Sequence, residues 1–410
     1  MRRASVLCLL IVAGLGLAPL LISPTLQSVL AKMLIAALFA GAFNLLAGQA
    51  GLLSFGHAAY FGIGAIATLQ AMSLAEAHIA NIPTPLLPIA GLVCGLLVAT
   101  VAGTFATKRS GAYFALVTLA IAELIHVIAP LWESLFGGEA GLTAMRMPWQ
   151  SIRFATPLEV YYLVGIWCFL GVVFLWFIYC STFGSLVRAV RSNEQRLAFV
   201  GVNTQYIKVV AFGISGGISG LAGGLLAVAS ETANYTLFSP AISIQVAFFA
   251  FIGGTTFFFA PIMIAAILTG VPFLISDYTR AWPLYQGLLF MSVMLYAPNG
   301  LFSVLDNLRY NIRAKRRMPI PTIIITTVGV LLVTAGVVVA VETVSRGHIP
   351  GQTLHRSTAI QAISPIRIPE QMTGFLVATI LSAAGMFLSM WSSKMMTARV
   401  DVPSRPGVAR

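Results

Sequence analysis

The feature that most constrains this chain is a series of apolar segments, each about the length of a membrane-spanning helix. Such a helix needs about 20 mostly apolar residues to cross a hydrocarbon core of about 30 Å. About a dozen candidates follow one another, at residues 5–22, 27–46, 58–74, 85–107, 112–131, 159–180, 208–230, 243–258, 261–277, 284–303, 320–341 and 371–391. Only 9% of the residues are charged, against about 25% in soluble domains. The sequence therefore predicts an all-α polytopic membrane protein, in which two of the segments are short for a full crossing.

Basic residues in the short loops predict the orientation of the helices, because such loops stay in the cytoplasm. If every candidate crosses, one topology puts most Lys and Arg on the cytoplasmic side, most carboxylates on the other, and both termini in the cytoplasm. The first segment follows Arg2 and Arg3 and is expected to stay uncleaved. The net charge of +12 is spread over the ends of the spans, so we expect membrane lipid and a cytoplasmic partner as counter-charges, and no nucleic acid.

A polar break interrupts the apolar pattern within NLLAGQAGLLSFGHAAYFGIGA, residues 44–65. In a bilayer, irregular backbone survives only where protein or cavity water shields it from lipid, and transporters use interrupted helices to build a substrate path. We expect a broken or re-entrant element that offers hydrogen bonds to a small polar solute. The candidate path residues here are Asn44, Gln49, Ser54 and His57. The alternative is structural: such side chains also cap helix ends or bond to a neighbouring helix.

A second polar element lies in SGAYFALVTLAIAELIH, residues 110–126. It places Thr118 and Glu123 inside an apolar run. A carboxylate within a membrane span is costly, which makes it a functional candidate. We add both residues to the predicted path. The competing interpretation of Glu123 is a structural acid paired with His126, one turn away.

Small residues at intervals of four predict which helices pack most closely, because they let backbones approach in lipid. Two segments, 85–107 and 208–230, carry such stripes. The predicted packing glycines are Gly91, Gly95, Gly103, Gly216, Gly220 and Gly224.

The connection over residues 181–208 is predicted to contain an amphipathic helix that Gly201 ends. Such a helix either lies on the membrane surface or docks on a partner. The chain contains no phosphate-binding loop, no HExxH and no GxSxG motif. Its four cysteines lack metal-ligand spacing. We therefore expect a chain that is not an enzyme and binds no metal or cofactor, with energy supplied by a partner or an ion gradient.

Several long stretches together resemble the LivM-type permease of branched-chain amino acid ABC transporters. They cover about residues 25–305 and comprise the 44–65 stretch, SGAYFALVTLAIAEL, RAVRSNEQRLAFVGVNTQYIKVVAFGISGGISGLAGGLLA and LLFMSVMLYAPNGLF. The resemblance implies a bacterial inner-membrane importer: a periplasmic solute-binding protein, this permease with a second, LivH-like permease subunit, and two cytoplasmic ATPases that use ATP and Mg. It also implies a coupling helix that docks on the ATPase, formed by Arg188, Arg191, Ser192, Asn193, Glu194, Gln195 and Arg196.

The expected organisation is a permease core with an appended extension. Residues 1–305 form a helix bundle of about ten membrane segments, 306–319 a basic cytoplasmic linker, and 320–410 an extension with two further transmembrane helices and a cytoplasmic tail. The core departs from the family at GGTTFFFAP, residues 253–261, where phenylalanines replace smaller residues. The expected solute is a branched-chain or other small apolar amino acid. Urea and short-chain amides, or a stand-alone secondary carrier or channel, stay open as alternatives.

Overall fold

A computed structural model describes Gly16 and residues 18–79, 81–149, 153–276, 282–297 and 299–303. The chain divides into two compact units, 1–274 with 290–304 and 275–289 with 305–410. The expected linker over 306–319 and the two expected helices beyond it lie outside the described residues. The account that follows concerns the first unit and gives, of the second, only the bounds of the helices that extend into it.

Nine of the expected segments coincide with helices, and six helices among the described residues are long and apolar enough to cross a membrane. The prediction of an all-α polytopic membrane protein is confirmed. The six are α2 (Pro24–Asn44) continued by the π-helical segment η2 (Leu45–Ala50), α3 (His57–Glu76), α4 (Pro88–Ala106) preceded by η3 (Thr84–Leu86), α5 (Ala112–Ile128) followed by η4 (Ala129–Leu131), α7 (Pro157–Cys180) and α10 (Thr204–Ser230).

The remaining apolar helices are shorter: α11 (Pro240–Gly253), α12 (Phe259–Ile275) and α13 (Trp282–Tyr296). With 14 residues, α11 is about 21 Å long at 1.5 Å per residue, which agrees with the expectation that two of the segments are short for a full crossing. The helix ends where Gly254 adopts a positive φ of 103°. The phenylalanine run that follows then belongs to a turn and to the start of α12.

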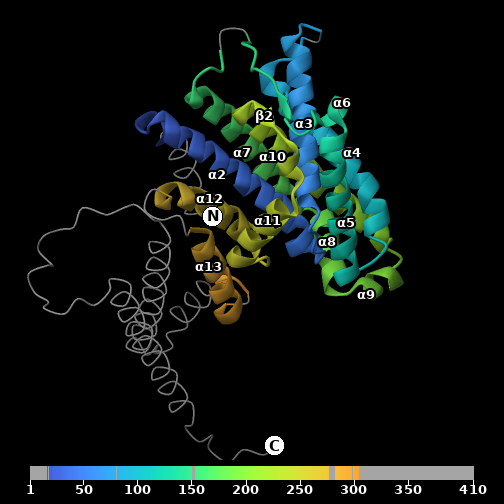
Figure 1. The fold of residues 1–410 in the computed structure, drawn as a ribbon. Helices are drawn as coiled ribbons and strands as arrows, with labels where there is room; N and C mark the ends of the chain where they lie inside the picture. The colour runs from blue at the N-terminus through green and yellow to red at the C-terminus, as the bar shows by residue number, and fades with distance from the viewer. Residues whose placement is uncertain are drawn as a thin grey trace, which may run out of the picture. The chain divides into compact units, whose positions relative to one another are not determined.

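Helix α10 is the most enclosed of the long helices and packs against α2, α3 and α4 (Figure 1). Close backbone contact joins α3, α4 and α10. A Cβ atom added to Gly220 would overlap the carbonyl oxygen of Gly91, and one added to Gly64 would overlap that of Gly220. One added to Gly95 would lie 2.8 Å from the carbonyl oxygen of Gly216. We call these five glycines the glycine seam. Two other predicted packing glycines face side chains: Gly103 and Gly224.

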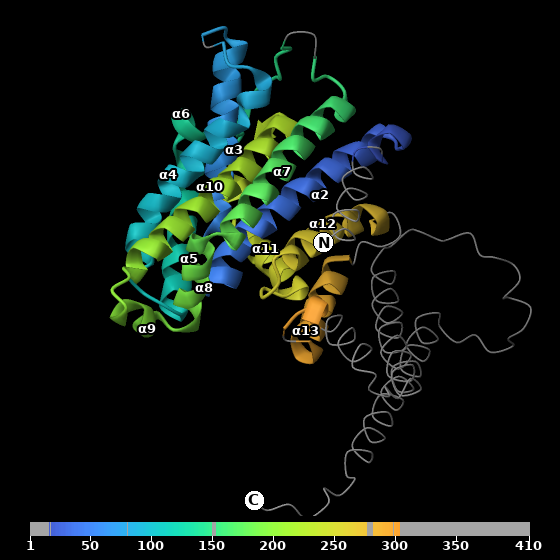
Figure 2. The same cartoon turned by 180° about the vertical axis from the view of Figure 1, so that it is seen from behind.

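Helices α2 and α7 pack side by side on the other side of α10 (Figure 2). Their close approach also uses small residues. A Cβ atom on Gly171 would lie 2.6 Å from a methyl group of Leu38, and one on Gly41 would lie 3.2 Å from Leu175. The buried hydrophobic core therefore runs between α2, α7 and α10, while the outer face of α7 stays exposed as expected for a lipid-facing helix.

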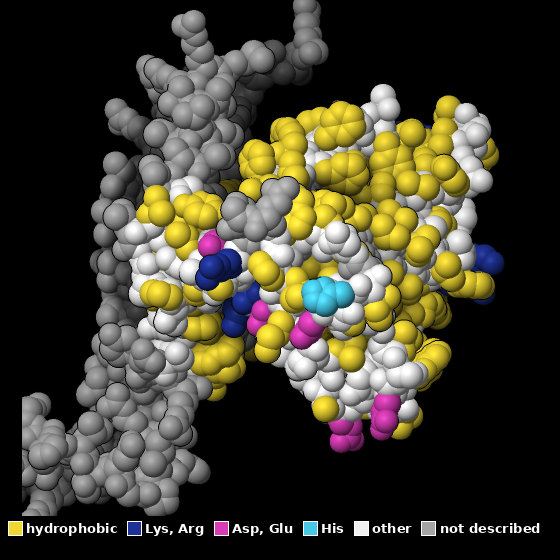
Figure 3. Space-filling model, turned by 90° about the horizontal axis from the view of Figure 1, so that it is seen from above, with side chains coloured by type: hydrophobic (Ala, Val, Ile, Leu, Met, Phe, Trp, Pro, Cys, Tyr) yellow, Lys and Arg dark blue, Asp and Glu magenta, His cyan; other side chains and the backbone are white. Residues whose placement is uncertain are grey.

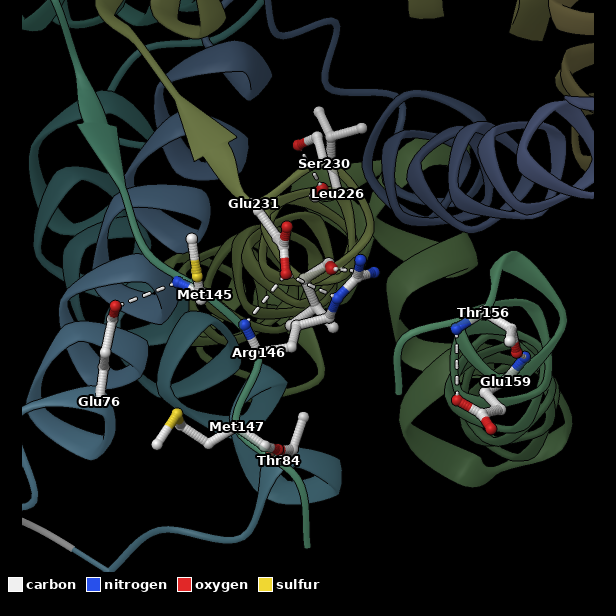
Figure 4. Close-up of polar contacts among 11 residues, drawn as sticks. Glu76, Thr84, Met145, Arg146, Met147, Thr156, Glu159, Leu226, Ser230 and Glu231 are labelled. Carbon is white, nitrogen blue, oxygen red and sulfur yellow. Dashed lines mark hydrogen bonds and ion pairs between the residues drawn. The ribbon is translucent and has the colours of Figure 1, made fainter. Parts of the chain in front are cut away.

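One end of the unit is closed by a short β-ribbon, in which β1 (Leu142–Thr143) pairs antiparallel with β2 (Thr232–Ala233). The loop after β1 is fastened by polar contacts (Figure 4). The Arg146 guanidinium and backbone N–H both reach the Glu231 carboxylate, at 2.9 and 3.0 Å. The Met145 N–H donates to Glu76 at 3.1 Å. Seen from this end, charged side chains lie beside large hydrophobic areas (Figure 3).

The opposite end carries two short helices, α8 (Thr182–Ser192) and α9 (Glu194–Phe199), in place of the single amphipathic helix expected in this connection. The helix is interrupted at Asn193, whose backbone is extended. Its side chain accepts a hydrogen bond from the Arg196 N–H at 2.9 Å. An Asn N-cap of this kind starts a new helix, so the amphipathic period does not continue across it.

Candidate functional site

The expected break in the second membrane segment is present. Helix α2 widens into the π-helix η2, and Gly51 then adopts a left-handed conformation with φ of 71°. Residues 52–56 form no regular helix before α3 starts at His57. The break is also enclosed, because Asn44, Ser54 and His57 are at most 1% exposed. A π-helical turn inside a longer helix is often found at functional sites.

The buried polar side chains of the break bond to neighbouring helices. The Asn44 amide donates to the carbonyl oxygen of Phe257 at 3.1 Å. The Ser215 hydroxyl of α10 donates to the carbonyl oxygen of Ala42 at 2.6 Å and lies 2.9 Å from Nε2 of His57. Since the single hydroxyl hydrogen goes to Ala42, Nε2 of His57 carries a proton and donates to Ser215. These bonds tie α2, α3 and α10 together.

Hydroxyl groups from other helices satisfy the backbone of the break. Thr118 of α5 accepts from the Phe55 N–H at 3.2 Å, and Ser243 of α11 accepts from the Ala58 N–H at 2.8 Å. Ser54 accepts locally from the Gly56 N–H at 3.2 Å. Predicted residue Thr118 is therefore brought to the break. Ser215 and Ser243 were missed, because a serine in an apolar helix reads as a small packing residue until its partner is known.

Glu123 lies apart from these residues. It is exposed on α5 and forms no ion pair with any residue that the structure describes. His126 instead lies 3.3 Å from the carbonyl oxygen of Tyr235. The structural pairing of Glu123 with His126 is therefore absent from the described residues. Gln49 is buried in η2, with 4% of its surface exposed.

The predicted coupling residues divide into two groups. Three are engaged within the chain: Arg191 donates to the carbonyl oxygen of Gly48, Glu194 pairs with Lys208, and Arg188 donates to the carbonyl oxygen of Tyr179 at 2.8 Å. The others are exposed side chains at the end of α8 and on α9, namely Ser192, Asn193, Gln195 and Arg196. The Arg191 bond attaches α8 directly to the π-helical break.

Two of the three phenylalanines that depart from the family pattern, Phe258 and Phe259, form an aromatic cluster at the same end. The Phe258 ring lies 5.1 Å from Trp176 and 5.2 Å from Tyr179, and Phe259 stacks on Trp176 at 5.0 Å. Arg188 of α8 lies over the Tyr179 ring at 4.5 Å. The larger side chains are thus accommodated against α7, and the cluster contacts α8 through Arg188.

A pocket of about 370 Å³ lies beside the break. Its walls include the Gly51 backbone, the Ser110–Gly111 turn before α5 and the side chains of Arg191, Glu194 and Lys208. Within the described residues, no group of three His, Cys, Asp or Glu side chains could hold a metal ion.

Comparison with known proteins assigns the family. A family model described as "Branched-chain amino acid transport system / permease component" matches residues 25–298. The chain belongs to this family. The matched range contains the break, α8, α9 and every residue that lines the pocket. The resemblance to LivM-type permeases is thereby confirmed, and the chain is a membrane-embedded permease component.

Two curated relatives are also similar to this chain. Each is named "High-affinity branched-chain amino acid transport system permease protein LivM", one from Salmonella typhimurium (strain LT2) and one from Escherichia coli (strain K12). Each is 26% identical over 285 residues, covering 63% of this chain and 65% of the relative. The match thus spans less than two thirds of the relatives' length. No solved structure matches the chain at a significant level.

Proposed function

We propose that this chain is the transmembrane permease subunit of an ATP-driven ABC importer for branched-chain or other small apolar amino acids. The single observation that carries the proposal is the family match over residues 25–298, together with the two relatives named LivM. The proposed assembly has a second permease subunit, two cytoplasmic ATPases that use ATP and Mg, and a periplasmic solute-binding protein. In it the chain lies in the bacterial inner membrane, with both termini and α8–α9 in the cytoplasm.

The face of α5 around Glu123 supports a role in solute passage. The neighbouring exposed side chains are apolar: Leu116, Leu124 and Val127. A charged side chain within a membrane helix costs roughly 3 kcal/mol when it faces lipid. The cost disappears if a second permease subunit or a hydrated path covers this face. We therefore assign the solute path to the α5 face, with the buried break as the element that closes it.

The exposed part of the α8–α9 connection supports coupling to a separate ATPase. Gln195 and Arg196 project from α9, and Phe199 at its end is 91% exposed. Behind them, Arg188 and Arg191 fasten α8 to α7 and to η2. A displacement of α9 would therefore be transmitted to the break through α8. The docking surface we propose is narrower than the predicted one, because Arg188, Arg191 and Glu194 are already engaged.

Uptake by reconstituted vesicles tests the proposal. Proteoliposomes containing the co-purified permease pair and ATPases, with binding protein outside, would receive labelled leucine, urea or acetamide, with or without internal ATP. We expect leucine to accumulate only with ATP. Accumulation that ignores ATP would instead identify a secondary carrier. ATP-dependent uptake of urea or acetamide without leucine would identify the amide-type permease.

A charge reversal on α9 tests the coupling surface in the same vesicles. Arg196→Glu should lower leucine uptake and solute-stimulated ATP hydrolysis together, because it removes an exposed cation from the proposed contact. Arg153→Glu is the matched control, since Arg153 is exposed in the loop before α7 and far from α9 in sequence. Equal loss in both variants would contradict the assignment of α9.

A further inference from the structure

The pocket beside the break combines two kinds of wall. The apolar lining residues include Ala47, Leu53 and Phe251. The charged lining residues are Arg191, Lys208 and Glu194, two cations and one anion. Its volume of about 370 Å³ lies in the range of sites for small organic ligands. A ligand that suits both walls has an apolar part and charged groups of both signs.

The charged wall retains binding capacity after its internal bonds are counted. Arg191 uses Nη1 on the Gly48 carbonyl oxygen, and a guanidinium has five N–H donors. In Glu194, Oε1 accepts from both Lys208 and Thr204, and no described residue bonds to Oε2. The remaining Arg191 donors can bond to a carboxylate on the ligand, and the Oε2 atom of Glu194 can accept from an ammonium group.

We propose that this pocket binds a free amino acid zwitterion with a branched apolar side chain. Its carboxylate would bond to Arg191 and Lys208, its ammonium group to Oε2 of Glu194, and its side chain would lie against Leu53 and Phe251. A phosphate group or a simple anion would leave the apolar wall and Glu194 unpartnered. The inference rests on the proposed function for its ligand class and for placing the pocket at the cytoplasmic end, where it would receive the transported product.

A ligand bound in this pocket would contact both η2 and α8. The pocket walls include Ala47 and Ala50 of η2 as well as Val190 of α8. A bound amino acid would therefore stabilise one relative position of η2 and α8. The site thus gives the product a direct contact with the proposed transmission element, separate from the α5 face around Glu123.

Binding to the full-length chain, purified in lipid nanodiscs without partners, tests the proposal by calorimetric titration. The probes are L-leucine, L-leucinamide, which lacks the carboxylate, 4-methylpentanoate, which lacks the ammonium group, and inorganic phosphate. We expect L-leucine to bind at least tenfold more tightly than the other three. Absence of leucine binding, or equal binding of leucinamide or phosphate, would overturn the proposal.

Variants locate the site. Glu194→Gln and Arg191→Gln should each weaken leucine binding at least tenfold, whereas Arg109→Gln, which removes an exposed cation in the nearby turn, should leave it within twofold. Thermal unfolding midpoints show whether each variant folds, and the probe series on the unaltered chain needs no variant. Binding that survives Glu194→Gln but is lost in Glu123→Gln would overturn the pocket assignment.

The two proposals can fail separately. ATP-driven leucine uptake by vesicles, with no leucine binding that depends on Glu194, would refute the pocket and leave the importer intact. Leucine binding that depends on Glu194, without ATP-driven leucine uptake, would refute the importer and leave the binding site.

Discussion

The glycine seam and the polar break both contact helix α10, but different interactions hold the elements together in each. In the seam, the backbones of α3, α4 and α10 touch because Gly64, Gly91 and Gly220 have no side chains. In the break, hydrogen bonds such as His57 to Ser215 join the elements. Helices whose backbones touch can take only one relative position, because a protein interior is packed as densely as a solid. Hydrogen bonds in a membrane protein contribute about 0.6 kcal/mol each on average, so they can exchange partners. We infer that the seam is the fixed frame and the break is the part that moves.

The largest expected effect is in the seam. Gly220→Val should lower the free energy of unfolding by about 3 kcal/mol or more, because the new side chain meets the Gly91 backbone, which cannot rotate away. SDS titration of the protein in mixed micelles measures this. Gly165→Ala on α7 is the control, since its Cβ would meet only Leu34 at 3.8 Å. Equal stability of the two variants would contradict the inference that the glycine seam is the fixed frame.

The next effect is at the turn that ends the π-helix. Gly51→Ala should cost about 1–2 kcal/mol, because φ of 71° is a left-handed conformation that disfavours a Cβ atom. Gly51→Asn should cost less, since Asn tolerates this conformation better. The same titration measures both. If Ala and Asn are equally destabilising, crowding against Arg191, and not the backbone conformation, determines the cost.

A smaller effect is expected from the hydrogen bonds of the break. Ser215→Ala removes the bonds to His57 and Ala42 and should lower the free energy of unfolding by about 1 kcal/mol. We expect the loss of leucine uptake to be larger than this loss of stability alone would cause. Ser219→Ala is a closely matched control, because Ser219 bonds only within its own helix, to the carbonyl oxygen of Ser215 at 2.8 Å. Similar uptake in the two variants would mean that the break does not move during transport.

The smallest effect is at the β-ribbon end. The Arg146 and Glu231 side chains are 15% and 35% exposed, so a double-mutant cycle with Arg146→Gln and Glu231→Gln should give a coupling energy of about 0.5–1 kcal/mol. The cycle is measured by SDS titration, and it should shrink at 1 M salt. A coupling energy of several kcal/mol between Arg146 and Glu231 would mean that the β-ribbon is also rigid. The glycine seam would then not be the only fixed frame among the described residues.

The helix pattern was predictable from the sequence because the bilayer imposes it. Each span needs a run of apolar residues of fixed length, and such runs are visible without knowing any contact. The break was predictable for a related reason: Gly48, Gly51 and Gly56 gather with polar residues where a lipid-facing helix would have neither. The position where α11 ends was harder to predict than its shortness, because its apolar run continues into the phenylalanines after Gly254 and hides the helix end.

The roles of individual side chains depended on partners far away in sequence. Arg191 and Glu194 look like free surface charges on an amphipathic helix, and only the fold brings Gly48 and Lys208 beside them. Asn193 splits that helix because its side chain caps α9, a local choice that competes with helix continuation.

The sequence by itself determined that this protein lies in a lipid bilayer. It also determined the helical class, the family and the position of the break, because all of these follow from composition and from order along the chain. Only the tertiary structure decided which polar groups bond to one another and where a pocket remains between them. Hydrogen bonds and cavities are set by the meeting of helices that are distant in sequence, and their geometry is not encoded in any one segment.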